Sequence, residues 1–406
     1  MATILGLRDT STFTADRFEN WRRVILYLYP NGKAPLTALL SLTEPEETND
    51  PHYNWYQKPL PNQRSVLSQA FLSTDMVIKV ANAVYRQGHV VLDELTGEIM
   101  EVTMVDSTGL NLSVIRGNWG AAAASSGASD PITVIGNVNA EGGFVPQSLS
   151  IDPTPFKNYT QIFRTPLELT GTSMNTALKY DRTGPYKEEL REKLAFHSIE
   201  MEKSFLFGKL AEYNDPQSGK LKRTTQGIIG YLPAGYQVTP ANASGLVTQA
   251  EWSGWLELVF RYVSNQANEK LMLVGSGMLN ALNTMALQIG KMETVAGDEA
   301  FGMALTRWYT PFGTVYLRTH PLFTQHPVWR YNGLILDIHN LVYRHVIGRD
   351  TQRLINRQAN DQDARIDEFL TESGLEVHHF GLGLSTGSAD QGTHLYITNV
   401  TGTTGS

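Results

Sequence analysis

The chain has 406 residues, enough for about two or three folding units with hydrophobic cores of their own. Hydrophobic residues make up 41% of the sequence and charged residues only 18%, which indicates a surface that is largely buried in an oligomer. The absence of cysteine excludes disulfides, cysteine metal sites and cysteine nucleophiles. A net charge of −7 without a basic tail or an arginine cluster argues against nucleic-acid binding driven by charge.

The N-terminal segment, residues 1–42, predicts one helix over residues 16–27 within what is otherwise an arm. Its first residues lack the basic and apolar regions of a signal peptide. No apolar run in the chain approaches the roughly 20 residues that a membrane-spanning helix needs, so we expect no membrane partner.

Residues 43–65 are polar and rich in proline, and their pattern alternates too little to bury a core. We expect an extended loop here, with a loose surface loop as the alternative. Trp55 and Tyr56 stand out in this segment, because aromatic side chains of this size need a surface that covers them.

Residues 76–138 predict a compact run of β-strands. Short apolar runs are separated by turns at Gly97 and Gly109. The predicted strands are residues 76–80, 89–93, 99–105, 110–116 and 132–135. Short strands at this spacing are typical of a small β-barrel-like unit.

A long helix is predicted from Pro185 to Glu212, after extended segments over residues 156–163 and 167–172. Pro185 suits the first helical position, and Glu188 lies where the helix dipole favours negative charge. At 1.5 Å per residue the helix would be roughly 40 Å long. Its second half is apolar on two faces, which indicates a helix held between layers.

Residues 226–345 mix helices with strands. The expected elements are helices over residues 251–268 and 278–289 and strands over residues 270–274, 313–318 and 333–338. Further strands are predicted over residues 374–380 and 395–398. This mixture makes the chain an α+β protein.

Few residues suggest chemistry. Gly275-Ser276-Gly277 lies between a strand and a helix, but it lacks the further residues of a dinucleotide fingerprint or a P-loop, so a tight turn is expected. Four carboxylates around one hairpin could be imagined as glycosidase acids, but their place beside a surface turn favours a solvated rim. They are Asp93, Glu94, Glu98 and Glu101.

The histidines predict no metal site. Neighbours on a strand point to opposite faces, and the more distant pairs match no common ligand spacing. The pairs are His378 with His379, His320 with His326, and His339 with His345. Because the sequence also lacks a nucleophile elbow, we predict no catalytic, cofactor-binding or metal-binding residue.

Three short motifs around the long helix carry a resemblance to a known family. They are Asn158-Tyr159-Thr160-Gln161-Ile162-Phe163 before the helix, Phe205-Leu206-Phe207-Gly208 near its end, and Gly227-Ile228-Ile229-Gly230 beyond it. Together with the order of segments over most of the chain, they resemble the major capsid proteins of tailed bacteriophages. The shared architecture of that family is called the Hong Kong 97-type capsid fold.

The resemblance implies a domain organisation. The expected parts are an N-terminal arm (1–42), an extended loop (43–156) with a β-barrel-like insertion at about 76–138, a peripheral domain (157–225) with a spine helix (185–212), an axial domain (226–345), and a return to the peripheral domain with the C-terminal segment (346–406). The spine helix would be the element that bends between precursor and mature shells.

The resemblance implies assembly and not catalysis. Subunits made in the host bacterial cytoplasm would form hexamers and pentamers and close into the icosahedral head shell of the virion around double-stranded DNA, with which contact is non-specific. The residues expected between subunits are Trp21 and Tyr27 on the arm, with Trp55 and Tyr56 on the loop. No cofactor is expected.

Other proteins would complete the particle. Since no long charged helical leader is present, we expect a separate scaffolding protein or none. A portal and a decoration protein are further expected partners. An encapsulin-like compartment is the alternative within the same fold, against which the large β insertion counts. A β-rich carbohydrate-active phage enzyme is the alternative from a different class.

Overall fold

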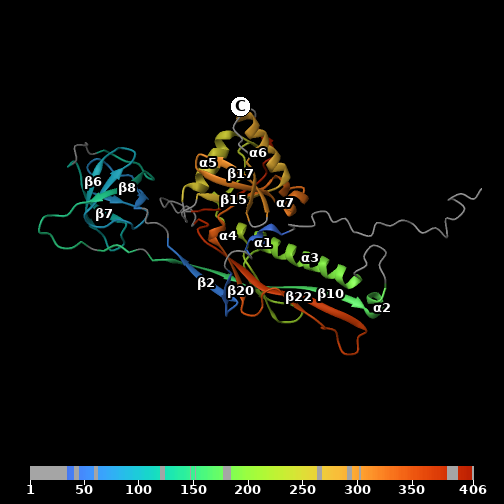
Figure 1. The fold of residues 1–406 in the computed structure, drawn as a ribbon. Coiled ribbons are helices and arrows are strands. Elements are labelled where there is room, and N and C mark those ends of the chain that lie inside the picture. The colour runs from blue at the N-terminus through green and yellow to red at the C-terminus, as the bar shows by residue number, and fades with distance from the viewer. Residues whose placement is uncertain are drawn as a thin grey trace, which may run out of the picture.

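The structure is a computed structural model of the chain, shown in Figure 1. It describes residues 34–40, 45–58, 63–118, 124–146, 148–150, 152–176, 184–262, 268–289, 295–300, 303–381 and 392–404. Within these ranges the strands form three larger sheets, of five, six and seven strands, and several two-stranded ones. Helices and strands are mixed throughout, which confirms the predicted α+β class.

The six-stranded sheet is the β-rich unit that the sequence predicted. Its strands are β3 (Arg64–Val66), β4 (Val77–Lys79), β5 (His89–Asp93), β6 (Ile99–Val105), β7 (Asn111–Ile115) and β8 (Pro131–Asn137), in the order β3-β8-β5-β6-β7-β4. A bridge between Leu67 and Val80 joins the two edges, so the sheet closes into a small barrel around a core of its own. The five predicted strands are confirmed, whereas β3 is too short for a periodic pattern to reveal.

A two-stranded ribbon connects this barrel to the rest of the chain. Strand β2 (His52–Gln57) pairs antiparallel with β9 (Thr154–Tyr159), and Figure 1 shows the barrel held apart at the far end of the ribbon. Side chains of β2 alternate strictly between exposed and buried. Residues 43–65 were expected to alternate too little to bury a core of their own, and this segment does alternate in β2, whose inward Tyr53 and Trp55 join the large core of the chain. Prolines on either side of the short strand obscured its period-2 pattern.

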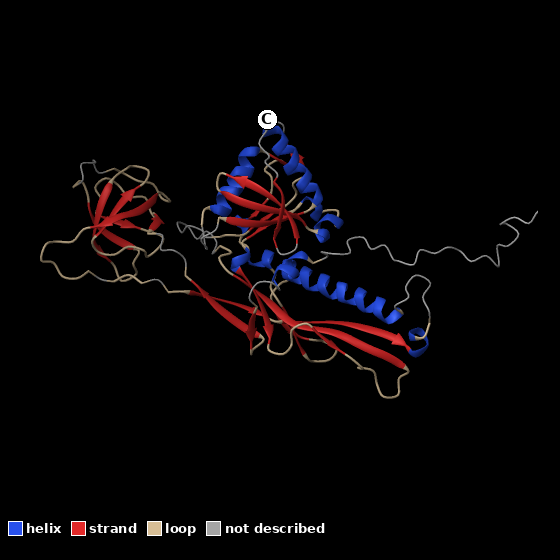
Figure 2. Ribbon diagram, viewed as in Figure 1, coloured by secondary structure: helices blue, strands red, loops and turns tan. Residues whose placement is uncertain are grey.

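The five-stranded sheet supports the long helix. Its strands are β1 (Glu46–Thr48), β20 (Leu341–Val346), β22 (Ala364–Val377) and β10 (Gln161–Thr170) in that order, with β21 (Gln352–Leu354) also paired to β22. Helix α3 (Pro185–Phe207) runs along β10 and β22, as Figure 2 shows. The short helices α1 (Pro35–Leu40) and α2 (Gly171–Met174) lie near its two ends.

His197 links helix α3 to both long strands beneath it, β10 and β22. Its Nδ1 lies 3.0 Å from the hydroxyl of Thr165 on β10, and its Nε2 lies 2.8 Å from the hydroxyl of Thr371 on β22. Burial lowers the pKa of His197. A neutral imidazole has one donor and one acceptor nitrogen, so it suits two hydroxyl partners that can each do either.

The seven-stranded sheet forms the second large layer. Its order is β13 (Gln237–Val238), β23 (Leu395–Ile397), β19 (Gly333–Leu336), β15 (Glu269–Val274), β18 (Gly313–Thr319), β17 (Met303–Thr310) and β16 (Val295–Ala300). Helices α5 (Gln249–Phe260), α6 (Ser276–Ile289) and α7 (Pro321–Gln325) lie around it (Figure 2). The remaining elements are β11 (Ala211–Asn214), β12 (Leu221–Thr224), α4 (Ile228–Tyr231), β14 (Leu246–Val247), β24 (Gly402–Thr403) and the 3₁₀ turns η1 (Ala234–Tyr236), η2 (Trp329–Tyr331) and η3 (Ile338–Asn340).

Helix α3 ends five residues earlier than predicted, at Phe207 and not at Glu212. The reason is a backbone crossing at Gly208, whose carbonyl accepts a hydrogen bond from the backbone N of Gly227 at 2.9 Å. A Cβ on Gly208 would lie 2.4 Å from the carbonyl oxygen of Thr225. Two of the three motifs that suggested the family therefore meet in space. The residues between them form the hairpin of β11 and β12.

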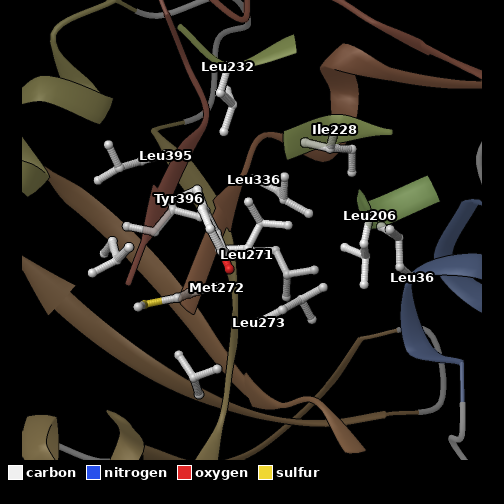
Figure 3. Packing of buried hydrophobic residues seen from close by; sticks show 14 of the residues in the cluster. Leu36, Leu206, Ile228, Leu232, Leu271, Met272, Leu273, Leu336, Leu395 and Tyr396 are labelled. Atoms are coloured by element: carbon white, nitrogen blue, oxygen red, sulfur yellow. The ribbon is translucent and has the colours of Figure 1, made fainter. Parts of the chain in front are cut away.

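One hydrophobic core joins the five-stranded and the seven-stranded sheet. Figure 3 shows Leu36, Leu206 and Ile228 grouped on one side of Leu273 and Leu336, and all five side chains are almost completely buried. Helix α1, the end of α3 and the centre of the seven-stranded sheet thus share one core, while the barrel has its own.

The crossing generates a test of this architecture. We expect Gly208→Ala to lower the free energy of unfolding by about 1–3 kcal/mol, because the added methyl group overpacks a backbone contact. Gly254→Ala is the matched control, since Gly254 is an exposed residue of α5 with open space around it, and there we expect a gain of about 0.5–1 kcal/mol. Thermal or denaturant unfolding of both variants measures the difference. Equal stabilities would contradict the tight crossing.

Candidate subunit-contact surfaces

Of the four residues expected between subunits, the structure describes two. Trp21 and Tyr27 lie outside the described residues. Trp55 is only 6% exposed and packs within its own chain against Phe156 and Tyr231, among other rings. The expectation that Trp55 needs a neighbouring subunit to cover it was therefore wrong, because strand alternation turns it inward. Tyr56 points the other way and is 71% exposed, so its place in a subunit contact stays a prediction.

Several other large apolar side chains lie on the surface. The most exposed are Leu72, Leu95, Met104, Phe144, Val145, Leu287 and Val328. The pair Phe144 and Val145 is almost fully exposed and follows Gly142 and Gly143 in the segment between β8 and β9. A glycine turn followed by apolar residues is the sequence signal that could have drawn attention to this pair.

Glu202 forms a buried junction between three parts of the chain. Its Oε1 accepts a hydrogen bond from the backbone N of Leu36 at 2.8 Å and lies 2.8 Å from Nε2 of His320. The side chains of Glu202 and His320 are completely buried. Helix α1, helix α3 and the end of β18 are thereby tied to one carboxylate. A buried carboxylate needs such partners, because desolvation of an unpaired charge is very unfavourable.

The outer face of the five-stranded sheet carries a ladder of ion pairs. Glu368, Glu372 and Glu376 project from one face of β22, and Arg164, Arg349 and Arg344 pair with them in that order. Burial opposes ionisation, but hydrogen bonds from His378 and Arg344 hold the pKa of Glu376 below its usual range. The sequence contains no run of arginines, but the fold brings Arg164 to the same strand that Arg344 and Arg349 contact, much further along the chain.

The expectation of a solvated rim was wrong for two of the four hairpin carboxylates. Asp93 and Glu98 are buried, and Glu98 forms an ion pair with Arg116 in which both side chains are almost inaccessible. Glu94 pairs with Arg64 at the surface, and this partner lowers the pKa of Glu94 to about 2. These contacts tie strands and loops of the barrel together. They leave no carboxylate pair in this group free for glycosidase chemistry.

A second buried ion pair crosses the seven-stranded sheet. Nζ of Lys270 on β15 lies 2.7 Å from Oδ2 of Asp337, and the backbone N of Asp337 lies 3.2 Å from Nδ1 of His394. Burial first, and then the charge of Lys270, lower the pKa of His394 to about 4. His379 lies near this pair, and burial lowers its pKa as well.

The remaining histidines lie in different surroundings. His326 stacks on Trp329, and His378 contacts Glu376 at 2.6 Å. His345 is buried with Glu47 nearby, while His339 is exposed. No group of three His, Asp or Glu side chains that could hold a metal ion occurs among the described residues.

Gly275-Ser276-Gly277 is the tight strand-to-helix turn that was expected. A Cβ on Gly275 would lie 2.4 Å from the carbonyl oxygen of Arg330, and one on Gly277 would lie 2.7 Å from the ring of Tyr331. The 3₁₀ turn η2 therefore packs closely against both glycines, which leaves no room for a side chain at either position.

A long helix on a long-stranded sheet, a ribbon that carries a barrel, and a helix-flanked second sheet together define an α+β subunit of the capsid type. The chain belongs to the family described as "SU10 major capsid protein", whose family model matches residues 7–382. It is 26% identical over 361 residues to a major capsid protein of Pseudomonas phage PaMx41, covering 87% of this chain and 84% of that protein.

Similar solved structures include two full-length matches. One is the SrpI encapsulin of Synechococcus elongatus PCC 7942, with a TM-score of 0.48, 11% identity, and coverage of 98% of this chain and 97% of that chain. Another comes from Mycobacterium phage Cain, with a TM-score of 0.47, 9% identity, and coverage of 97% and 98%. Among the described residues, no helix is both long and apolar enough to cross a membrane.

The buried His394 predicts a pH dependence of stability. Its pKa is about 4 in the folded chain, against about 6.5 for an ordinary histidine, so between these values only the unfolded chain binds the proton. We expect His394 to remove about 2 kcal/mol of unfolding free energy between pH 7 and pH 5. His394→Gln should flatten this dependence, and His339→Gln, at an exposed histidine, should keep it. Urea titrations at both pH values provide the measurement, and equal slopes for the two variants would refute the assignment.

Proposed function

We propose that this chain assembles through hexamers and pentamers into the icosahedral head shell that encloses phage double-stranded DNA. The observation that carries the proposal is the family match over residues 7–382, nearly the whole chain. The subunit would be made in the host bacterial cytoplasm and become part of the virion. Its contribution is mechanical, and the shell rather than any single site is the functional unit.

The proposed parts correspond to the elements described above. Helix α3 with the five-stranded sheet would be the peripheral domain, and the seven-stranded sheet with its helices the axial domain around the capsomer axis. The ribbon and barrel would be the extended loop that lies over a neighbour. Repeated contacts between two different surfaces of identical subunits produce closed rings, and the angle between subunits sets their number.

The proposed partners of the shell are a separate scaffolding protein, a portal and a decoration protein, with packaged DNA as a non-specific neighbour. The ion-pair ladder matches each exposed arginine to a less exposed carboxylate, which supports a wall without strong net attraction for DNA. No observation specifically favours the encapsulin-like alternative. The carbohydrate-active enzyme is less well supported, because Asp93 and Glu98, two of the carboxylates considered as glycosidase acids, are buried in structural contacts.

Assembly is tested directly by expressing the chain alone and then with the scaffolding gene of its genome. Size-exclusion chromatography with negative-stain microscopy should reveal rings, tubes or megadalton shells. A 45.1 kDa monomer that persists with scaffold supplied would overturn the proposed function.

The neighbouring aromatics of β2 predict opposite phenotypes. Trp55→Ala should lower the free energy of unfolding by about 3–5 kcal/mol, because it leaves a cavity in the chain's own core. Tyr56→Ala should change it by less than about 0.5 kcal/mol but reduce the yield of shells, because the exposed ring is expected to contact a neighbour. Unfolding curves and particle yields separate the two effects. A wild-type shell yield for Tyr56→Ala would remove this residue from the interface.

A further inference from the structure

The segment between β8 and β9 presents a hydrophobic tip. A turn in which the backbone N of Gly143 donates to the carbonyl of Ala140 holds out Phe144 and Val145, which are 102% and 94% exposed. Glu141 lies beside them and is exposed as well. Two adjacent large apolar side chains with no intrachain cover indicate a contact that another molecule completes.

A surface recess of about 350 Å³ lies at the other end of the ribbon. It is formed by the start of β10, the β11–β12 hairpin and β22. Ile162, Tyr213 and Leu221 line it, and each is about half exposed. Lys222 and Arg223 also line it, each paired with a carboxylate of its own chain, and Glu372 adds a negative charge. The recess is thus partly apolar and large enough for an aromatic side chain.

The tip of one chain cannot fill the recess of the same chain. Strand β10 begins directly after β9, so the recess lies at the base of the ribbon, whereas the tip belongs to the segment at its barrel end. Figure 1 shows this segment and the five-stranded sheet well separated. The six residues of β9 alone span about 20 Å. Only a second molecule can bring the two surfaces together.

We propose that Phe144 and Val145 of one subunit insert into the recess lined by Ile162, Tyr213 and Leu221 of the next copy of this chain. The inference rests on the proposed function and specifies one contact within it. Because tip and recess lie at opposite ends of the same ribbon, each subunit donates to one neighbour and accepts from another. Such a contact is heterologous and repeats around a ring.

The lack of cysteine in the chain permits a direct test. The double variant Phe144→Cys with Tyr213→Cys is assembled, oxidised and examined on a non-reducing gel. A disulfide needs Cα atoms within about 7 Å, so bond formation reports the distance between tip and recess. We expect a ladder of covalent multimers of the 45.1 kDa chain that reducing agent collapses. Mixing the two single variants before assembly should give dimers only.

A matched control uses Leu95→Cys with Tyr213→Cys, since Leu95 is 71% exposed on another loop of the same barrel. This pair should give no ladder. A second pair, Phe144→Cys with Leu221→Cys, allows for a small shift in register. If microscopy shows shells but neither Phe144 pair gives a ladder, the inference fails while the proposed function stands. If no assembly forms with scaffold supplied, the proposed function itself fails.

Discussion

Helix α3 ends where its backbone lies directly against the segment that enters the seven-stranded sheet, with no side chain between them. Gly208 and Gly227 permit this approach, and a hydrogen bond of 2.9 Å joins their backbones. Leu206 and Ile228, on either side of the crossing, then enter one common core with the centre of that sheet. The two large sheets therefore behave as one body, and the helix can transmit a displacement from one to the other without a loose linker.

Buried charges specify this arrangement more than they stabilise it. A fully buried ion pair gains little net free energy, but a buried charge that loses its partner is strongly destabilising. Glu202 satisfies its oxygen with Leu36 and His320, and Lys270 is matched to Asp337. An alternative packing of α1 or of the sheet would leave one of these buried charges without its partner. Helix α1 is thereby held in one position on helix α3.

Sequence reasoning predicted the elements whose signals are local. The strands of the barrel follow from alternation between glycine turns, and the start of α3 follows from Pro185. Its end does not, because Gly208 stops the helix through contacts with residues 225–227 that lie far along the chain from α3's start. The inward orientation of Trp55 depends on a partner strand about 100 residues away, and the Arg164–Glu368 pair of the ladder joins residues about 200 apart.

The extended subunit indicates that folding and assembly are coupled. The barrel has a core of its own, but the ribbon that carries it has only two strands, and an isolated two-stranded ribbon is marginally stable in water. Inward residues such as Trp55 pack one face of the ribbon on the chain itself, whereas Tyr56 leaves the other face uncovered. Covering that face would stabilise the ribbon by mass action, as any partner does that binds only the folded form. A ring in which every subunit covers the next would then stabilise all of its ribbons together, and the orientation of each barrel would be set by its neighbour as much as by its own chain.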